Sequence, residues 1–465
     1  MSKIDDLIRI NRIKTLPNIL ISRIDFVKDR KCDHLEKDKI KDDTNQSLRD
    51  GIVFTTFYKS LIKNDFFQEK LVPITITFIV TNALLGIAPE RYFVCFVSPV
   101  LAQVEQDIFA AGLEKLKQGD YAKAIADFTE AIRLNPDNTE IYFNRAMTYN
   151  TIGKPEKAIA DLDRVILAHP DQANAYFNRG NSYGTLGNFP KALENYDQAI
   201  LLDGNNSLAY LNRGVIYWVL ENYPKAIADY DQAILLDPRY ALAYNNRGLV
   251  YQKLANFPQA IANFNQAIRL NTSNAFFYIN RADTYAFLEN FQQAITDYNQ
   301  AIILDPKNVD AYTNRGGAYL QLGIPKEAVK DYTQAISLDP KNTLAYINRG
   351  IAYRELGNFT MALKDHNQGI FFEPNDDNSY LQRGITYEFL KNYSAALKDY
   401  SQAIKLNAHN AEAYFNRGTL YQALNNRKKA IADLQRALDL YEKQEKLEEV
   451  QEIKKRFSIL KYSQP

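Results

Sequence analysis

Cysteine, histidine and any excess of one charge are what this 465-residue chain has least of. Its two cysteines, Cys32 and Cys95, both precede residue 103, so the sequence after that point forms no disulfide of its own. The four histidines are too scattered for a metal-ligand motif, and we expect neither a metal nor a cofactor. They are His34, His169, His366 and His409.

Charge is balanced, with 56 Lys and Arg against 55 Asp and Glu. The chain as a whole therefore carries no electrostatic footprint for nucleic acid, which is excluded as a partner on this ground. Tryptophan occurs once, at Trp218, whereas 31 Tyr and 25 Phe make the chain rich in other aromatics.

What is present is a repeat. Asn-Arg-Gly, or a close variant, recurs every 34 residues without insertion, which predicts a solenoid of two-helix units. Ten units start at residue 105 and end at residue 444. The arginine of the tripeptide, at position 7 of each unit, occurs at Arg145, Arg179, Arg213, Arg247, Arg281, Arg315, Arg349, Arg383 and Arg417.

Apolar and small residues within each unit follow the 3.6-residue period of amphipathic helices. Position 20 is alanine throughout, and position 8 is always Gly or Ala, which allows two helices to approach closely. Gly-Asn or Glu-Asn before the second helix, and Asp-Pro or Asn-Pro after it, mark the boundaries. Each unit is predicted to be helix A, a turn near position 15, helix B and a loop.

This pattern resembles the tetratricopeptide repeat (TPR). Unit 173–206 shows it as Tyr176, Gly180, Tyr183, Leu186, Gly187, Phe189, Ala192, Tyr196 and Ala199. The resemblance implies an all-α, right-handed α-solenoid superhelix whose concave groove is lined by helix A. It also implies a protein–protein scaffold without catalysis. Residues of the family's carboxylate clamp are missing here, so binding of a chaperone tail is not expected. TPR arrays also precede the catalytic domain of O-linked N-acetylglucosamine transferases, but about twenty residues after the last unit leave no room for one.

The arginine row departs from the family, which usually has Leu at position 7. Unpaired, such a row would be costly to bury. We predict that each arginine bonds a position-23 side chain, mostly Asp, or a helix C-terminal carbonyl between units, with anion binding as the less favoured alternative. The structural ladder is therefore Arg179, Arg213, Arg247, Arg281, Arg315 and Arg349.

Two sets of residues are candidates for contact with a partner. Amides at position 6 suit the backbone of an extended peptide, although local hydrogen bonds are the alternative. They include Asn178, Asn212, Asn246, Asn280, Asn314 and Asn348. Apolar side chains expected in the central groove suit a partner helix or peptide, and packing between units is the alternative. They are Leu211, Trp218, Phe276 and Phe287.

The ends differ from the array. Residues 1–70 are charged and predicted to be disordered. Residues 71–88 contain no charge and are just long enough to span a bilayer, and Val100-Leu101-Ala102 resembles a signal-peptidase site. Residues 71–102 are therefore predicted to be a signal or anchor, an arrangement similar to exported bacterial TPR proteins, cyanobacterial ones among them. A buried core helix is the alternative. After the units at 103–444, residues 445–465 are predicted to form a capping helix and tail.

Together these features predict a non-catalytic scaffold that binds a protein or peptide partner in its groove. The alternatives are a self-associating structural protein, which would form a homo-oligomer, and a membrane-anchored assembly factor. The expected location is membrane-associated or exported to a periplasm or lumen, and otherwise cytoplasmic.

Overall fold

The computed structural model describes the backbone of residues 89–462 and the side chains of residues 102–457. Within that part the chain forms 21 α-helices and no strand. The predicted tail 1–70 and the uncharged segment 71–88 lie outside the described residues. Contacts divide the chain into two units that meet at Gly204 and Asn205, and each is described by itself.

The first unit contains α5 (Pro89–Lys117) and five shorter helices, which pack in sequence order. They are α6 (Tyr121–Leu134), α7 (Thr139–Thr151), α8 (Pro155–Ala168), α9 (Ala173–Thr185) and α10 (Phe189–Leu202). The helix α5 runs unbroken through Ala102, so the boundary predicted at residue 102 falls inside a helix. Among the helices that the structure describes, none is both long enough and apolar enough to cross a bilayer.

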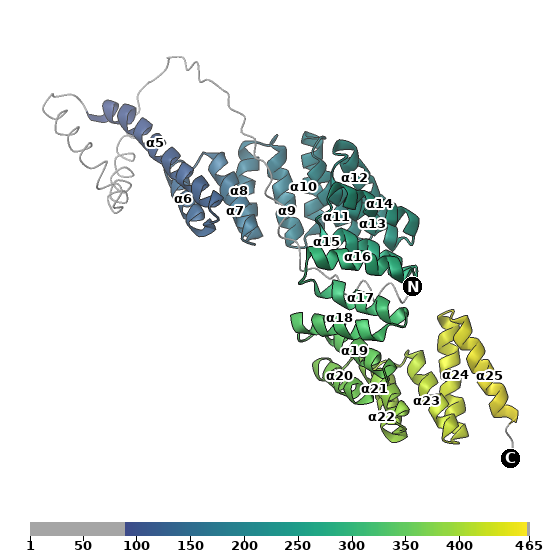
Figure 1. Cartoon of the computed structure of the whole chain (residues 1–465). Helices are drawn as coiled ribbons and strands as arrows, with labels where there is room; N and C mark the ends of the chain where they lie inside the picture. The colour runs from purple at the N-terminus through teal and green to yellow at the C-terminus, as the bar shows by residue number, and fades with distance from the viewer. Residues whose placement is uncertain (1–88, 463–465) are drawn as a thin grey trace. The chain divides into compact units, whose positions relative to one another are not determined.

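The second unit continues the same pairing from residue 205 onward (Figure 1). Its first four pairs are α11 (Ser207–Val219) with α12 (Tyr223–Leu236), α13 (Ala241–Lys253) with α14 (Phe257–Leu270), α15 (Ala275–Phe287) with α16 (Phe291–Leu304), and α17 (Val309–Gln321) with α18 (Pro325–Leu338). Then follow α19 (Thr343–Glu355) with α20 (Phe359–Phe372), α21 (Asp377–Phe389) with α22 (Tyr393–Leu406), α23 (Ala411–Ala423) with α24 (Arg427–Lys443), and a last helix α25 (Leu447–Tyr462).

Helix boundaries follow local chemistry that repeats with the period. Asparagine at position 16 caps most B helices; the Asn222 side chain, for example, accepts a hydrogen bond from the backbone N–H of Lys225. Position 15 has a positive φ in all ten repeats, and five of these residues are not glycine. The left-handed residue ends helix A and lets the Asn222 N–H reach back to the Tyr217 carbonyl.

The core is a series of small clusters, each shared by one helix pair and the next helix A. Around α15 and α16 the fully buried residues include Ala282, Ala294, Tyr298 and Ala301, with Ala311 and Ala318 added from α17. Helix A and helix B touch closely at position 8, since a Cβ on Gly214 would lie 2.8 Å from the Tyr230 ring. The predicted all-α class of stacked helix pairs is therefore confirmed.

The C-terminal cap is the helix α25, which lies within residues 445–465, where a capping helix and tail were predicted. The preceding helix α24 ends at Lys443, and Glu445 takes a positive φ between the two helices. Val450 and Ile453 of α25 are buried against Leu440 and Tyr441. The cap is thus held by apolar packing as well as solvated by its charged residues.

Candidate interaction surface

The arginine row is fully engaged in the structure. Nε and Nη2 of Arg281 donate to the two carboxylate oxygens of Asp297 at 2.7 and 2.6 Å. The Asp297 side chain is 7% exposed, so the pair is nearly removed from water. Seven arginines make this position-7 to position-23 pair. The partners of Arg145, Arg213, Arg281, Arg315, Arg349, Arg383 and Arg417 are Asp161, Asp229, Asp297, Asp331, Asp365, Asp399 and Asp433.

Two arginines face an amide at position 23 instead, Asn195 for Arg179 and Asn263 for Arg247. Each then pairs with an aspartate at position 25 of the preceding repeat, Arg179 with Asp163 and Arg247 with Asp231. Every arginine of the row therefore has a carboxylate partner. Burial of nine guanidinium groups is tolerated because each charge is matched within hydrogen-bond distance.

The predicted bond from each arginine to a position-23 side chain is present, and a second bond, which was not predicted, links neighbouring repeats. Position 23 lies in the arginine's own repeat, so the partner between repeats is position 25 of the preceding helix B, as in the 2.6 Å bond from Arg281 Nη1 to Asn265. Each guanidinium also lies against the tyrosine at position 4, at 5.9 Å from the Tyr278 ring centroid for Arg281. The sequence carries a signal for the bond to position 25, because a hydroxyl, amide or carboxylate occurs there, 16 residues before each arginine.

The first repeat lacks the arginine but keeps the ion pair. Ala110 and Ala111 stand where Asn and Arg stand elsewhere, and Lys115 replaces the tyrosine of position 11. Lys115 Nζ lies 2.5 Å from Asp127 Oδ2, so a cation from a different position serves the same aspartate.

The asparagine row is mostly used inside the protein. Nδ2 of Asn178 donates to the Asn174 carbonyl of its own helix, and Nδ2 of Asn280 donates to Asn245 Oδ1 at 2.9 Å. Asn178 is 5% exposed and Asn280 is 9% exposed. Asn314 donates to Asp283 on the neighbouring helix A. Asn246 also takes part locally, since its Oδ1 accepts from Asn245 Nδ2. Local hydrogen bonds are therefore present along the row, and binding of a peptide backbone stays a prediction for it.

The predicted apolar residues divide into two groups. Leu211 is 6% exposed and belongs to the core with Ala226 and Tyr230, so it is unavailable to a partner; position 5 faces helix B rather than solvent. Phe287 packs on Phe257 with ring centroids 4.7 Å apart. Trp218 and Phe276, at 38% and 52% exposed, remain open.

We call positions 2, 9, 12 and 13 of the A helices in the second unit the helix-A face. Its exposed apolar members begin with Leu208, Trp218 and Val219 of α11 and continue with Phe276 of α15 and Phe389 of α21. Consecutive A helices, such as α15 and α17, are in contact, so the face is continuous from one repeat to the next.

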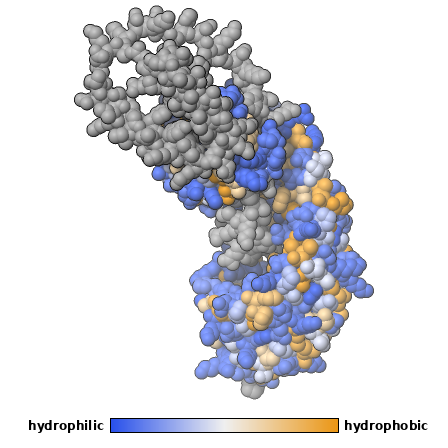
Figure 2. Space-filling view, turned by 90° about the vertical axis from the view of Figure 1, so that its left-hand side faces the viewer, coloured by the Kyte–Doolittle hydropathy of each residue, from blue (hydrophilic) through white to orange (hydrophobic). Residues whose placement is uncertain are grey.

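A second apolar row lies on helix B at position 29, which sequence analysis did not single out. We call it the helix-B row; in the second unit it consists of Leu235, Ile303 and Phe371, which are 72%, 70% and 74% exposed. Figure 2 shows one face of the protein, on which apolar side chains form small patches among hydrophilic ones. The exposure of three large side chains at one repeat position points to a surface that a partner could cover.

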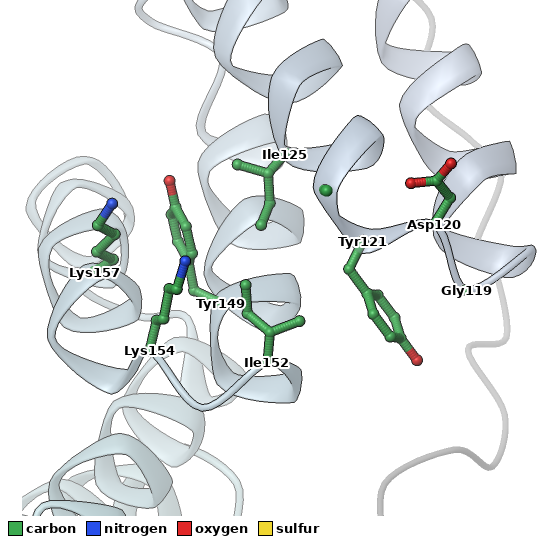
Figure 3. A pocket seen from close by; sticks show the side chains of 9 residues that line it. Gly119, Asp120, Tyr121, Ile125, Tyr149, Ile152, Lys154 and Lys157 are labelled. Atoms are coloured by element: carbon green, nitrogen blue, oxygen red, sulfur yellow. The ribbon is translucent and has the colours of Figure 1, made fainter.

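The first unit has a surface hollow of about 540 Å³ between the first two repeats. Figure 3 shows Lys154 and Lys157 beside Tyr149 on one side, and Tyr121 and Asp120 on the other. Lys157 Nζ lies over the Tyr149 ring at 5.6 Å, and Asp120 pairs with Lys123. Its charged groups are exposed or locally paired, which gives no defined ligand chemistry. Across the described residues, no cluster of His, Cys, Asp and Glu could hold a metal ion.

Protein-family models match the repeats. Those described as tetratricopeptide repeat or TPR repeat match residues 109–173, 173–206, 219–254, 241–274, 282–323, 309–342, 331–364, 390–425 and 411–444. These ranges cover more than half of the chain. The protein belongs to the tetratricopeptide repeat family. A comparison with curated protein sequences gives no match.

Several solved structures are similar to this TPR protein. MamA is 27% identical over 35% of this chain and 94% of that chain, with a TM-score of 0.33. YrrB, described as a TPR protein with an unusual peptide-binding site, is 24% identical over 40% of this chain and 96% of its own, with a TM-score of 0.36. A tetratricopeptide repeat protein from Parabacteroides merdae is 20% identical over 54% and 99%, with a TM-score of 0.45.

Proposed function

We propose that this TPR protein is a non-catalytic scaffold that binds a partner peptide or helix along the helix-A face of residues 205–444. The observation that carries the proposal is the exposure of Trp218 and Phe276 on this face, at 38% and 52%. Large aromatic side chains left open on one face are suited to anchoring an amphipathic partner. Membership of the TPR family supports an interaction role, because stacked repeats of this kind form an extended surface for a binding partner.

The test is selection of peptide ligands from a random phage-displayed library on the immobilised full chain. Selected peptides are then titrated by fluorescence polarisation against wild type and the Trp218→Ala, Phe276→Ala variant. We expect the variant to bind at least tenfold more weakly, since each anchor contributes on the order of 1–2 kcal/mol.

A matched control removes two exposed apolar side chains from helix B instead, by Leu235→Ala and Ile303→Ala. Circular dichroism establishes that both variants keep the helical content of the wild type. Equal affinity of wild type and the Trp218, Phe276 variant, or an equal loss in the helix-B control, would contradict binding on the helix-A face.

Self-association is a second candidate, favoured by the helix-B row. Leu235, Ile303 and Phe371 recur at one position on alternate repeats with about the same exposure, which gives two identical chains an apolar surface to bury against each other. Light scattering of the full chain across micromolar concentrations tests this. Oligomers that dissociate with Leu235→Ser and Ile303→Ser support it, and a wild-type monomer throughout that range contradicts it.

We also propose that residues 71–88 attach the chain to a membrane or direct its export. The support is their uncharged, apolar sequence. Fractionation of cells that express the full chain should place it in the membrane or exported fraction. Ile76→Arg with Ile79→Arg should shift it to the soluble cell fraction, whereas Ile10→Arg with Ile13→Arg should not. An unchanged distribution after the first pair would contradict the proposal.

A further inference from the structure

The outward side of the B helices changes charge along the array. Spacings of three, four and seven residues place positions 22, 25, 26 and 29 of each helix B on one side of it, and position 33 follows in the loop. The chain as a whole is nearly neutral, with 56 basic and 55 acidic residues. At these positions, however, the first three repeats are acidic and repeats seven to nine are basic.

We call the outward side of α6, α8 and α10, in the first unit, the acidic face. It has six carboxylates and two arginines, which gives a net charge of −4. The carboxylates are Glu130, Asp137, Asp163, Asp171, Glu194 and Asp197, and the arginines are Arg133 and Arg164.

Part of this negative charge is not matched within the protein. Glu130 pairs with Arg133, and Asp163 pairs with Arg179. Asp137, Asp171 and Glu194 are exposed, and no cation of the described residues lies within ion-pair distance of them. The lysines at position 19 of the same helices are engaged locally. Lys123 pairs with Asp120, while Lys157 and Lys191 lie over the rings of Tyr149 and Tyr183.

We call the outward side of α18, α20 and α22, in the second unit, the basic face (Figure 1). At the same repeat positions it has five exposed lysines and no carboxylate, namely Lys330, Lys341, Lys364, Lys398 and Lys405. Lys330 pairs with Glu327, whereas no carboxylate of the described residues lies within ion-pair distance of the other four. The loop acids Asp339 and Glu373, at position 31, reduce this positive charge but do not reverse it.

Each face also exposes large apolar side chains at position 29. On the acidic face these are Leu167 and Leu201, which are 79% and 77% exposed. On the basic face Phe371 is 74% exposed, and its ring makes an edge contact with Phe372 at 5.4 Å between centroids. Apolar side chains among charges of one sign have the composition of an interface with a partner of the opposite sign.

We infer that the basic face of one copy of this chain binds the acidic face of a second copy. Lysines of the basic face meet carboxylates of the acidic face, and Phe371 packs against Leu167 and Leu201. The two faces use the same positions of repeats of equal length, so charges on one recur with the spacing of charges on the other. The contact joins two different surfaces and leaves one face of each kind open, which permits further copies to add.

A second copy fits these observations better than another partner does. An unrelated acidic protein or an anionic lipid surface would complement the basic face only, and would leave the exposed leucines of the acidic face without a role. A second copy complements both faces in charge and in apolar surface. The inference rests on the self-association proposed above and adds which faces meet.

The experiment reverses charge on one face at a time in the full chain. Lys364→Glu with Lys398→Glu changes the basic face, and Asp171→Lys with Glu194→Lys changes the acidic face; all four residues are exposed. The control, Lys428→Glu with Glu448→Lys, exchanges two exposed charges on α24 and α25. Circular dichroism verifies that every variant keeps the wild-type helical content.

Light scattering and sedimentation equilibrium then give the mass of each species. Wild type and control should associate in the micromolar range, and less so when salt rises from about 0.05 M to about 0.5 M. Each face variant should associate at least about tenfold more weakly, because like charges then meet. An equimolar mixture of the two face variants should form a dimer and nothing larger, since one intact face of each kind remains.

Failure of the inference can be told apart from failure of self-association. If both face variants associate as wild type does, or if their mixture stays monomeric, self-association stands and the pairing of these two faces is wrong. If wild type is monomeric, both fail. If monomeric wild type sediments with phosphatidylserine vesicles and the Lys364, Lys398 variant does not, the basic face binds an anionic membrane, which also overturns the inference.

Discussion

Single residues in this protein act through pairs whose members lie 16 positions apart. The arginine at position 7 satisfies a buried aspartate of its own repeat and a polar side chain of the preceding one. Because the guanidinium is about four-fifths buried, screening by solvent is limited, and the pair is stronger than an exposed one. Removing one member therefore leaves the other without its partner in a poorly solvated place.

The first prediction at this scale is a double-mutant cycle at Arg281 and Asp297. Arg281→Leu and Asp297→Leu should each lower the free energy of unfolding by about 3 kcal/mol, since each leaves a buried charge unpaired. The double variant should be less destabilised than either single variant. Urea denaturation followed by circular dichroism measures the three values; losses that simply add would show that the two residues are not coupled.

His366 gives a pH-dependent prediction. It occupies position 24, where other repeats have Tyr, Phe or Leu, and neither ring nitrogen has a hydrogen-bond partner among residues 89–462. Burial, reinforced by the positive charges of Arg354 and Arg383, lowers the pKa of His366 to about 3. Below pH 6.5 the unfolded chain takes up a proton that the folded chain does not, so folding stability falls as pH decreases toward 3.

His366→Phe should therefore stabilise the protein at pH 5 more than at pH 8, as measured by thermal unfolding at both values. The exposed His409 is the control, and His409→Gln should leave the pH dependence unchanged. A His366→Phe variant with the same pH dependence as wild type would contradict the assignment.

At the scale of the helical element, the turn at position 15 decides where helix A ends. All ten repeats use a positive φ there, but only five have the residue type that adopts it without strain. The other five tolerate the strain of a Cβ in the left-handed region, because the Asn at the next position caps helix B and fixes the turn.

Ala255→Gly should thus raise the free energy of unfolding by about 0.5–1 kcal/mol, as left-handed strain exceeds the added entropy of glycine. The reverse change at an equivalent position, Gly323→Ala, should lower it by a similar amount. Guanidinium denaturation of the two variants measures both, and a loss of stability in Ala255→Gly would show that the turn is unstrained.

For the whole molecule, stability is a sum of repeats and of the contacts between neighbours. Within the part of the chain that the structure describes, each core cluster belongs to one pair and the next helix A, so no central core joins distant repeats there. The last pair depends on α25, whose Ile453 is fully buried against it.

Ile453→Asp should therefore unfold the end of the array locally. Hydrogen exchange followed by mass spectrometry should show loss of protection in α23 and α24, with α11 to α15 unaffected. The exposed Glu448 provides the control, as Glu448→Asp should change nothing. Loss of protection throughout the second unit would indicate a single cooperative fold instead.

Much of the fold could be predicted because its signals are local and repeated. The 34-residue period, the small residues at positions 8 and 20, and the Asn cap at position 16 placed nearly every helix pair. The sequence was insufficient where the repeat position alone does not decide which helix a side chain contacts. Leu211 was expected in the groove but is buried against Ala226 and Tyr230 of helix B, and the second bond of Arg281, to Asn265 at position 25 of the preceding repeat, was not predicted.

The sequence by itself determined that this chain is a stack of helix pairs, since each boundary depends on side chains within a few residues of it. It also determined which cations and carboxylates pair within a repeat. Only the tertiary structure decided which side chains remain open, namely Trp218 and Phe276, and that the buried Tyr332 hydroxyl has no hydrogen-bond partner among the described residues. The reason is physical: burial and hydrogen-bond satisfaction depend on what the adjacent repeat presents, and the period repeats positions but not the side chains that occupy them.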